Sequence, residues 1–383
     1  DDALVASKEL EITLTGKSCG LEERAPMCGI PYHAVEGYLT KLVSRGYKVA
    51  ICEQVEDPKL AKGLVKREVT RVVTPGTNLN VQSLEAGKNN YLLSIAYTSD
   101  GIGISAADVT TGDYYVTEVE DLKKLNDELM KYEPSEIICN EAFLVSGFDV
   151  NDLKSRLHIS VNALESHMFD DDGCRRILMK HFKVNTLIGL GVEEFPTGLL
   201  AAGALLQYLY DTQKTDLEHF THIYPYLTSK YMLLDSSTRR NLELTETLRE
   251  KQKRGSLLWV LDKTKTAMGA RLLRNYIEQP LIEKDEMEKR LDAIQELNQD
   301  SISRDEIREY LNPIYDLERL LSKVTYKTAN PRDLIAFRNS LQMLPPIKTV
   351  LSAFEKEELT EIREQIDGLE DIYQLIDEAI IEE

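Results

Sequence analysis

The sequence has few of the features that mark secreted, membrane-spanning or metal-binding proteins. Its five cysteines form no C-x-x-C pair, and an odd number spread over 383 residues argues against a disulfide framework. No run approaches the ~20 apolar residues that a membrane-spanning helix needs, and no basic-then-apolar signal pattern opens the chain. We therefore expect a cytoplasmic protein with free or buried thiols and no metal site.

The sequence also lacks the motif G-x-x-x-x-G-K-[ST], the loop whose backbone amides hold nucleotide phosphates. We therefore expect no catalytic site and no cofactor in these residues. The chain begins at Asp1 rather than at a methionine, and it stops at Glu383 within a charged segment of helical pattern. These ends predict an internal piece of a longer protein.

Basic residues are in the minority. The sequence has 46 Lys and Arg against 65 Asp and Glu, and the formal net charge of −19 argues against binding a polyanion. The excess is uneven, because residues 1–78 contain 11 residues of each sign whereas 355–383 hold twelve carboxylates and two basic residues. Within the neutral part, basic residues cluster around the single acid Glu68: Lys59, Lys62, Lys66, Arg67 and Arg71. These side chains either meet phosphates or form a solvated strand edge.

The first part of the chain has a mixed pattern. Leu10, Ile12 and Leu14 alternate with polar residues, which predicts a strand, and a polar loop is expected over 16–31. Apolar residues then recur at helical spacing over 35–43. Gly46 stands where a left-handed cap ends such a helix, and 47–52 alternates as a strand would.

The rest of the chain divides into an α/β region and a helical region. Strands are expected within YLLSIAYTS, GIGISAADVT and TGDYYVTEVE and at 136–139, and helices at 120–132, 172–183 and 197–211. This alternation favours a mixed sheet covered by helices. From Tyr231 onward the sequence shows helical periodicity, as in 287–297 and 334–344, with Asn330 and Pro331 suited to starting the second of these helices.

Three stretches carry a family resemblance. The stretch PMCGIPYHAVEGYLTKLVSRGYKVAICEQ at 26–54, followed by KREVTRVVTPGT at 66–77, closely resembles the mismatch-recognition domain of the bacterial MutS family of DNA mismatch repair proteins. The strands and helices that follow resemble its connector. The segment LLDSSTRRNLELTETL, with LLWVLDKTKTAMGARLLRNYIEQPL after it, resembles the start of its lever domain.

The resemblance implies a multidomain α/β plus all-α protein. Its parts are a mixed α/β recognition domain at 1–77, a linker at 78–90, an RNase H-like α/β connector at 91–225, and the first part of a helical lever at 226–383. In the lever motif DKTKTAMGAR, Thr266 can cap the next helix and Gly269 can let another backbone come close.

The resemblance also implies a function for the complete protein. Members of the family kink mismatched DNA as homodimers, insert a Phe-x-Glu wedge into the minor groove, hydrolyse ATP with Mg²⁺ in a DNA-dependent manner, and contact MutL through the connector. The wedge is expected upstream of Asp1, so we expect this piece alone to be a monomer that binds DNA feebly. Expected DNA contacts are Lys17, Met27, Lys62, Lys66 and Arg67.

Two alternative functions remain open at this stage. In an RNase H-like fold, Asp108 and Asp113 could hold catalytic metal ions, although the favoured interpretation is that Asp108 finishes a strand and Asp113 serves the turn. A MutS relative acting in recombination is the second alternative, and residues 1–78 argue against it because such relatives usually lack the recognition domain. A basic run over 239–254 indicates either contact with DNA or another domain, or a solvated helix face paired with nearby glutamates.

Overall fold

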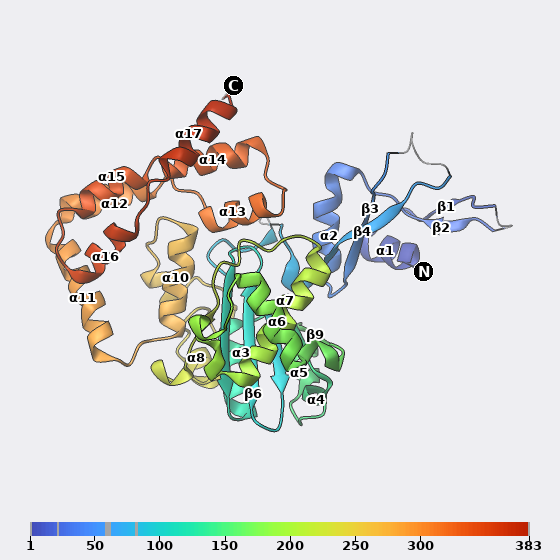
Figure 1. Cartoon of the computed structure of the whole chain (residues 1–383), viewed down its shortest axis with the longest axis horizontal. Helices are drawn as coiled ribbons and strands as arrows, with labels where there is room; N and C mark the ends of the chain where they lie inside the picture. Colours follow the sequence, from blue (N-terminus) through green and yellow to red (C-terminus); the bar gives the residue numbers. More distant parts are fainter. Residues whose placement is uncertain (1, 21–22, 58–62, 81–82, 382–383) are drawn as a thin grey trace. The chain divides into compact units, whose positions relative to one another are not determined.

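The computed structural model describes residues 2–20, 23–57, 63–80 and 83–381. By the density of its contacts the chain forms two compact units. The first unit comprises Asp1–Leu84, Asn90–Val109 and Pro134–Asp216. The second comprises Glu85–Asn89, Thr110–Glu133 and Leu217–Glu383. Figure 1 labels the helices and strands of both.

The N-terminal part of the first unit consists of two helices and two separate β-ribbons (Figure 1). Leu39 and Val43 of the second helix pack on Val73, with Val49 and Ile51 at the edge of this small core. The elements are helices α1 (Asp2–Leu10) and α2 (Val35–Val43), the first ribbon of β1 (Thr15–Lys17) and β2 (Ala25–Met27), and the second ribbon of β3 (Val49–Gln54) and β4 (Arg67–Val73).

The sequence prediction for this part is half correct. The helix at 35–43 is confirmed, and Gly46 takes the expected left-handed conformation, with φ of 85°. The strand expected over 10–14 is wrong, because α1 includes Leu10 and the chain turns at Glu11, whose φ is 56°. The expected loop at 16–31 is also wrong in part, since it contains most of the first ribbon.

The remainder of the first unit is a mixed sheet covered by helices. Its strands lie in the order β6 (Ile102–Asp108), β5 (Leu92–Tyr97), β8 (Glu136–Cys139) and β9 (Ser160–Ala163). The β5–β6 pair is antiparallel, whereas β5–β8 and β8–β9 are parallel. The longer helices are α6 (Asp171–Phe182) and α7 (Pro196–Gln213), and the shorter ones are α4 (Glu141–Leu144) and α5 (Val150–Ser155). The strands and longer helices predicted in this region are confirmed.

Helix α7 lies directly against strand β6. A Cβ atom at Gly103 would stand 1.9 Å from the carbonyl oxygen of Thr197, so only glycine fits between the strand and the first turn of the helix. Every residue of β6 is buried, and so is most of α7. This layer is therefore the dense core of the first unit.

The second unit is mainly helical. Its strand β7 (Asp113–Val119) pairs in parallel with the short β10 (Tyr224–Pro225). Its helices are α3 (Leu122–Tyr132), α8 (Ser236–Asn241), α9 (Leu257–Leu261), α10 (Ala267–Glu278), α11 (Lys284–Gln299), α12 (Ser301–Leu311), α13 (Leu317–Thr325), α14 (Pro331–Leu341), α15 (Leu344–Leu351), α16 (Glu357–Gln365) and α17 (Glu370–Ala379). Ala293, Ile347 and Phe354 lie in its core.

The residues predicted to start a helix at 330–331 do so in the second unit. Asn330 accepts a hydrogen bond from the amide of Asp333, whose carboxylate accepts one from the amide of Asn330, and Pro331 occupies the first turn of α14. The predicted helix at 334–344 is too long, because Leu344 begins α15. Among the described residues, none of the helices is long and apolar enough to span a bilayer.

Candidate nucleic-acid interface

The first ribbon carries two of the residues expected to touch DNA. Thr15 stands opposite Met27, and Lys17 stands opposite Ala25. Because side chains alternate between the two faces of a strand, Lys17 and Met27 point to the same face of this ribbon. Lys17 is exposed, and Met27 keeps 42% of its surface exposed. The ribbon thus presents a cation and an apolar side chain together.

The second ribbon carries the described part of the basic cluster. Lys66 and Arg67 are exposed at the start of β4, and Lys66 forms an ion pair with Glu68. Arg71 is half-buried and donates a hydrogen bond to the carbonyl oxygen of Thr77 at 3.1 Å, so its guanidinium braces the base of the ribbon. Lys62, like Lys59, lies outside the described residues.

The basic cluster is therefore divided by the fold. Lys66 immediately precedes β4, and its carbonyl oxygen accepts a hydrogen bond from the amide of Val55, which extends the ribbon by one residue. Because successive residues of a strand face opposite sides, Lys66 and Arg67 point away from each other. A β-bulge between Ile51 and Cys52 interrupts the alternation, so Arg67, opposite Gln54, and Arg71, opposite Ile51, lie on opposite faces of the ribbon. Arg71 is also committed to the base of the ribbon. Charge spacing in the sequence did not reveal this division, since it depends on strand pairing.

The two carboxylates considered for metal binding have structural partners. Asp108 ends β6, is fully buried, and accepts a hydrogen bond from the backbone amide of Asn90 at 3.0 Å. Asp113 begins β7 and accepts from the hydroxyl of Thr111 and the side-chain amide of Asn89, both at 2.8 Å. Among the described residues no group of three or more His, Cys, Asp or Glu side chains is arranged to hold a metal ion. The nuclease alternative has no support.

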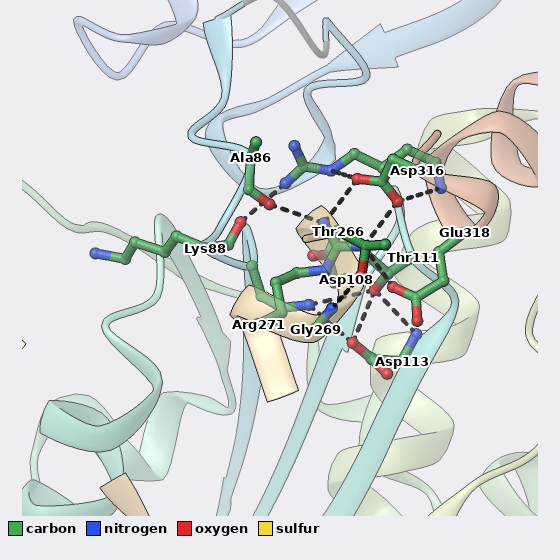
Figure 2. Close-up of polar contacts among 12 residues, drawn as sticks. Ala86, Lys88, Asp108, Thr111, Asp113, Thr266, Gly269, Arg271, Asp316 and Glu318 are labelled. Atoms are coloured by element: carbon green, nitrogen blue, oxygen red, sulfur yellow. Dashed lines mark hydrogen bonds and ion pairs between the residues drawn. The ribbon is translucent and has the colours of Figure 1, made fainter. Parts of the chain in front are cut away.

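The lever motif proves to be a structural centre of the second unit. The Thr266 hydroxyl accepts from the amide of Gly269 at 3.0 Å and caps α10, as predicted. The atoms nearest to a Cβ at Gly269 belong to the side chains of Thr266 and Thr264, so the expected approach of another backbone is wrong. Figure 2 shows Thr266 and Gly269 among the polar contacts of this region.

Arg271 joins α10 to the first turn of α13. Its side chain is 4% exposed, and its Nη1 and Nη2 donate to the two carboxylate oxygens of Asp316, both at 2.7 Å (Figure 2). Nη2 also donates to Glu318 at 2.6 Å, and Nη1 donates to the carbonyl oxygen of Ala86 at 2.9 Å. A planar guanidinium with several fixed donors suits this double pairing.

The segment Glu85–Asn89, which we name the strap, is held by a second buried arginine. Arg319 of α13 is 2% exposed, and its Nη2 donates to the carbonyl oxygens of Glu85 and Lys88 at 3.1 and 2.8 Å. The strap is the only part of the second unit that precedes residue 110. Lever residues therefore fix the backbone of a segment far away in the sequence.

A buried charge group lies near the end of α10. The Arg274 guanidinium pairs with Glu278 at 3.0 Å and with Glu133 at 3.2 Å, and Lys88 also pairs with Glu133. Burial raises the pKa of Glu278 to about 7, against the attraction of Arg274 and Arg239. The pKa of Glu133 is lowered instead, because Lys88 and Arg274 outweigh its burial. The two carboxylates thus titrate in different pH ranges.

The basic run over 239–254 does not form one helix face. Only Arg239 and Arg240 lie in α8, and the following residues form turns. Arg239 donates to the carbonyl oxygen of Leu234 at 2.9 Å, and Lys253 pairs with Asp262. The helix-face interpretation is therefore wrong, because the expected pairing distances require a continuous helix.

Comparison with known proteins identifies a succession of domain families along the chain. Three family models match the chain in order: MutS domain I at residues 1–82, MutS domain II at 90–221 and MutS domain III at 237–383. The match to domain I includes both ribbons, and the match to domain III includes the lever motif.

Whole relatives match along the entire chain. The DNA mismatch repair protein MutS of Lachnoclostridium phytofermentans is 65% identical over 383 residues, which are 100% of this chain and 41% of that protein. The proteins of the same name from Ruminiclostridium cellulolyticum and Caldanaerobacter subterraneus are 50% and 49% identical over 100% and 99% of the chain. The chain spans 44% of the length of each of these two. With three successive MutS domains and this degree of identity, the chain belongs to the MutS family.

Proposed function

We propose that the complete protein recognises mispaired or unpaired bases in duplex DNA and starts their repair. The observation that supports this most is the unbroken series of MutS domains I, II and III along the chain. The relatives are named as DNA mismatch repair proteins, and domain I is matched here, which speaks against the recombination alternative.

The two ribbons are the proposed DNA contacts. Lys17 and Met27 share one face of the first ribbon, where the cation can meet a phosphate and the apolar side chain can lie beside an opened minor groove. Lys66 and Arg67 of the second ribbon, and Lys62 earlier in the sequence, would meet the DNA backbone. The neutral overall charge of residues 1–78 keeps this region from repelling DNA, unlike the acidic remainder.

The proposed selection is by deformability rather than by base edges. A mispair resists unstacking and bending less than a matched pair, so a protein that bends its site spends less free energy on mismatched DNA. The ribbons need only hold the sugar-phosphate backbone of the DNA on both sides of the point where the duplex bends. This role agrees with the exposed cations of the ribbons, Lys17, Lys66 and Arg67.

The experiment compares a G·T duplex with its fully matched counterpart. The protein expressed from its complete gene is expected to bind the G·T duplex more tightly, and the 383-residue chain alone is expected to bind both weakly at low salt. Replacing Lys17 by Ala removes a phosphate contact, so the slope of log K against log salt should fall in magnitude by about 1.

The control is Lys154→Ala, which removes an exposed lysine on α5, a helix that belongs to neither ribbon. It should leave affinity and salt slope unchanged. Equal affinity of the complete protein for both duplexes would refute the proposed function, and tight mismatch-selective binding by the chain alone would refute the need for further domains.

We also propose, on the resemblance, the partners of the complete protein. These are MutL, docking on the connector, a second copy of the protein, and ATP with Mg²⁺. Because residues 1–383 contain no nucleotide-binding motif, we propose that ATP and Mg²⁺ bind elsewhere in the complete protein. The proposed location is the cytoplasm. Pull-down of MutL by the chain, and its loss when residues 90–221 are deleted from the complete protein, would test the first of these.

A further inference from the structure

A buried glutamate joins the second ribbon to the connector sheet within the first unit. Glu136 begins β8 and its side chain is completely inaccessible to solvent. Its Oε2 accepts from the backbone amide of Gly76 at 3.1 Å, and its Oε1 accepts from the hydroxyl of Tyr208 at 2.8 Å and the amide of Asn162 at 3.1 Å. The ammonium of Lys48 lies 3.6 Å from Oε1.

Two partners of Glu136 stand at the same end of the second ribbon, its base. Lys48 immediately precedes β3, and Gly76 follows soon after the end of β4. Val49 and Val73 pair at this end of the ribbon, and they lie one residue after Lys48 and three residues before Gly76. One carboxylate therefore holds the incoming and the outgoing strand at the base of the ribbon.

Helix α7 completes this joint. The Lys48 ammonium donates to the Tyr208 hydroxyl at 3.1 Å and lies 5.3 Å from the centre of its ring. The side-chain amide of Gln213 donates to the carbonyl oxygen of Val72 at 3.4 Å. Burial and the neighbouring Glu136 raise the pKa of Tyr208, so its hydroxyl stays protonated and can donate to the carboxylate.

The joint also has little space in which to shift. A Cβ atom at Gly76 would lie 2.8 Å from the Cβ of Leu92 and 3.1 Å from the Cβ of Glu136. Thr74 and Thr77 hydrogen-bond each other through their hydroxyls at 2.9 Å, both fully buried. The turn that leaves the ribbon is thus packed against the first residues of β5 and β8.

A buried carboxylate is tolerated only when its donors are in place. Removing an ion from water costs several kcal/mol, which three hydrogen bonds and a nearby ammonium offset here. A different ribbon direction would withdraw Lys48 and Gly76 together and leave the charge unpaired. The buried charge therefore favours one direction of the ribbon more strongly than an apolar contact of similar area would.

We propose that Glu136 is a positioning residue that fixes the direction in which the β3–β4 ribbon leaves the connector sheet, so that ribbon and sheet turn as one body. Glu136 itself is buried and touches no DNA. If the connector sheet rotates, the ribbon would then rotate with it through the same angle. Glu136 would hold the ribbon in this way whether or not the ribbon binds DNA.

The test measures the distance distribution between two spin labels in the 383-residue chain. One label is on Cys52, which is exposed on β3, and the other is on a cysteine introduced by Lys154→Cys on α5. Cys19 and Cys28 are replaced by Ser. Cys139 and Cys174 need no replacement, because burial raises their pKa values to about 11 and about 12 and hides them from the label.

The parent should give one narrow distance distribution. Glu136→Ala should broaden it or add a second population, and Lys48→Met, which keeps the aliphatic stem, should do so to a smaller extent. Glu136→Gln keeps the shape and one acceptor oxygen, so it should restore most of the narrow population. Lys48→Met added to Glu136→Ala should broaden the distribution no further, since both act at one joint.

The matched control is Glu141→Ala, which removes an exposed carboxylate at the start of α4. It should leave the distribution unchanged. An unchanged distribution in Glu136→Ala would overturn the proposal, as would equal broadening in Glu141→Ala. If Glu136→Ala does not fold, Lys48→Met and Tyr208→Phe carry the test, and narrow distributions in both would likewise overturn it.

Discussion

Replacement of Arg271 by alanine should destabilise the second unit strongly. The substitution leaves Asp316, which is only 17% exposed, without its two guanidinium hydrogen bonds, and it removes the donor to the Ala86 carbonyl. Removing one partner of a buried pair costs about 3–5 kcal/mol. The longer ion pair of Asp316 with Arg319, at 3.8 Å, offsets only part of this cost. Glu318 adds little to this sum, since it is 43% exposed.

The assay uses the single tryptophan of the chain. Trp259 lies on α9 in the second unit and is 47% exposed, so its fluorescence during urea unfolding reports on that unit. Arg271→Ala should lower the unfolding free energy by about 3–5 kcal/mol. The unfolding free energy of Arg271→Lys should lie between those of the parent and Arg271→Ala, because one ammonium cannot form both carboxylate pairs in the guanidinium's geometry.

Hydrogen exchange gives a second reading of the same change. Ala86 loses its bond to Arg271 while Glu85 and Lys88 keep theirs to Arg319, so exchange in the strap should become faster in the variant. The control Lys284→Ala removes an exposed pair with Glu288 and should cost at most about 1 kcal/mol. A loss in Arg271→Ala no larger than in this control would refute the reasoning.

Three further predictions concern single sites. Folding raises the pKa of Glu278 from 4.5 to about 7, so the folded state favours the protonated carboxyl. The stabilisation that this provides is fully present below pH 4.5 and is lost as the pH rises through about 7. Glu278→Gln should therefore gain about 3 kcal/mol over the parent between pH 5 and pH 8, and a pH-independent difference in Trp259-detected unfolding would contradict this. Asn330→Ala removes the cap of α14 and should lower the unfolding free energy by about 1 kcal/mol in the same assay. An unchanged unfolding free energy would contradict a stabilising role for the capping box. Gly103→Ala forces α7 off β6 and should cost about 1–3 kcal/mol or more in thermal unfolding followed by circular dichroism, whereas an unchanged midpoint would show that the contact can relax.

Local signals in the sequence predicted the elements whose causes are local. The helix at 35–43 followed from apolar spacing and a glycine cap, and α14 followed from Asn330 and Pro331. The segment ending at Leu10 was misassigned because three alternating apolar residues fit a strand as well as a helix end, and only burial decides between them.

The polar joints were beyond sequence reasoning. Glu136 pairs with Lys48 before β3, Gly76 after β4 and Tyr208 of α7, and Arg319 binds carbonyl groups of the strap, so neither partner set shares a sequence neighbourhood. One signal was available for Glu136, since a carboxylate opens the otherwise apolar strand EIIC. The DNA contacts Lys17, Met27, Lys62, Lys66 and Arg67 stay predictions.

The position of the strap limits how such a gene can be rearranged. Glu85–Asn89 belongs to the second unit, yet the residues on both sides of it belong to the first, and the chain crosses between the units again after Val109, Glu133 and Asp216. A recombination event that exchanged one domain for that of a distant relative would place foreign strap residues under Arg271 and Arg319. Domains I to III should therefore be inherited as one block, with their histories of descent in agreement.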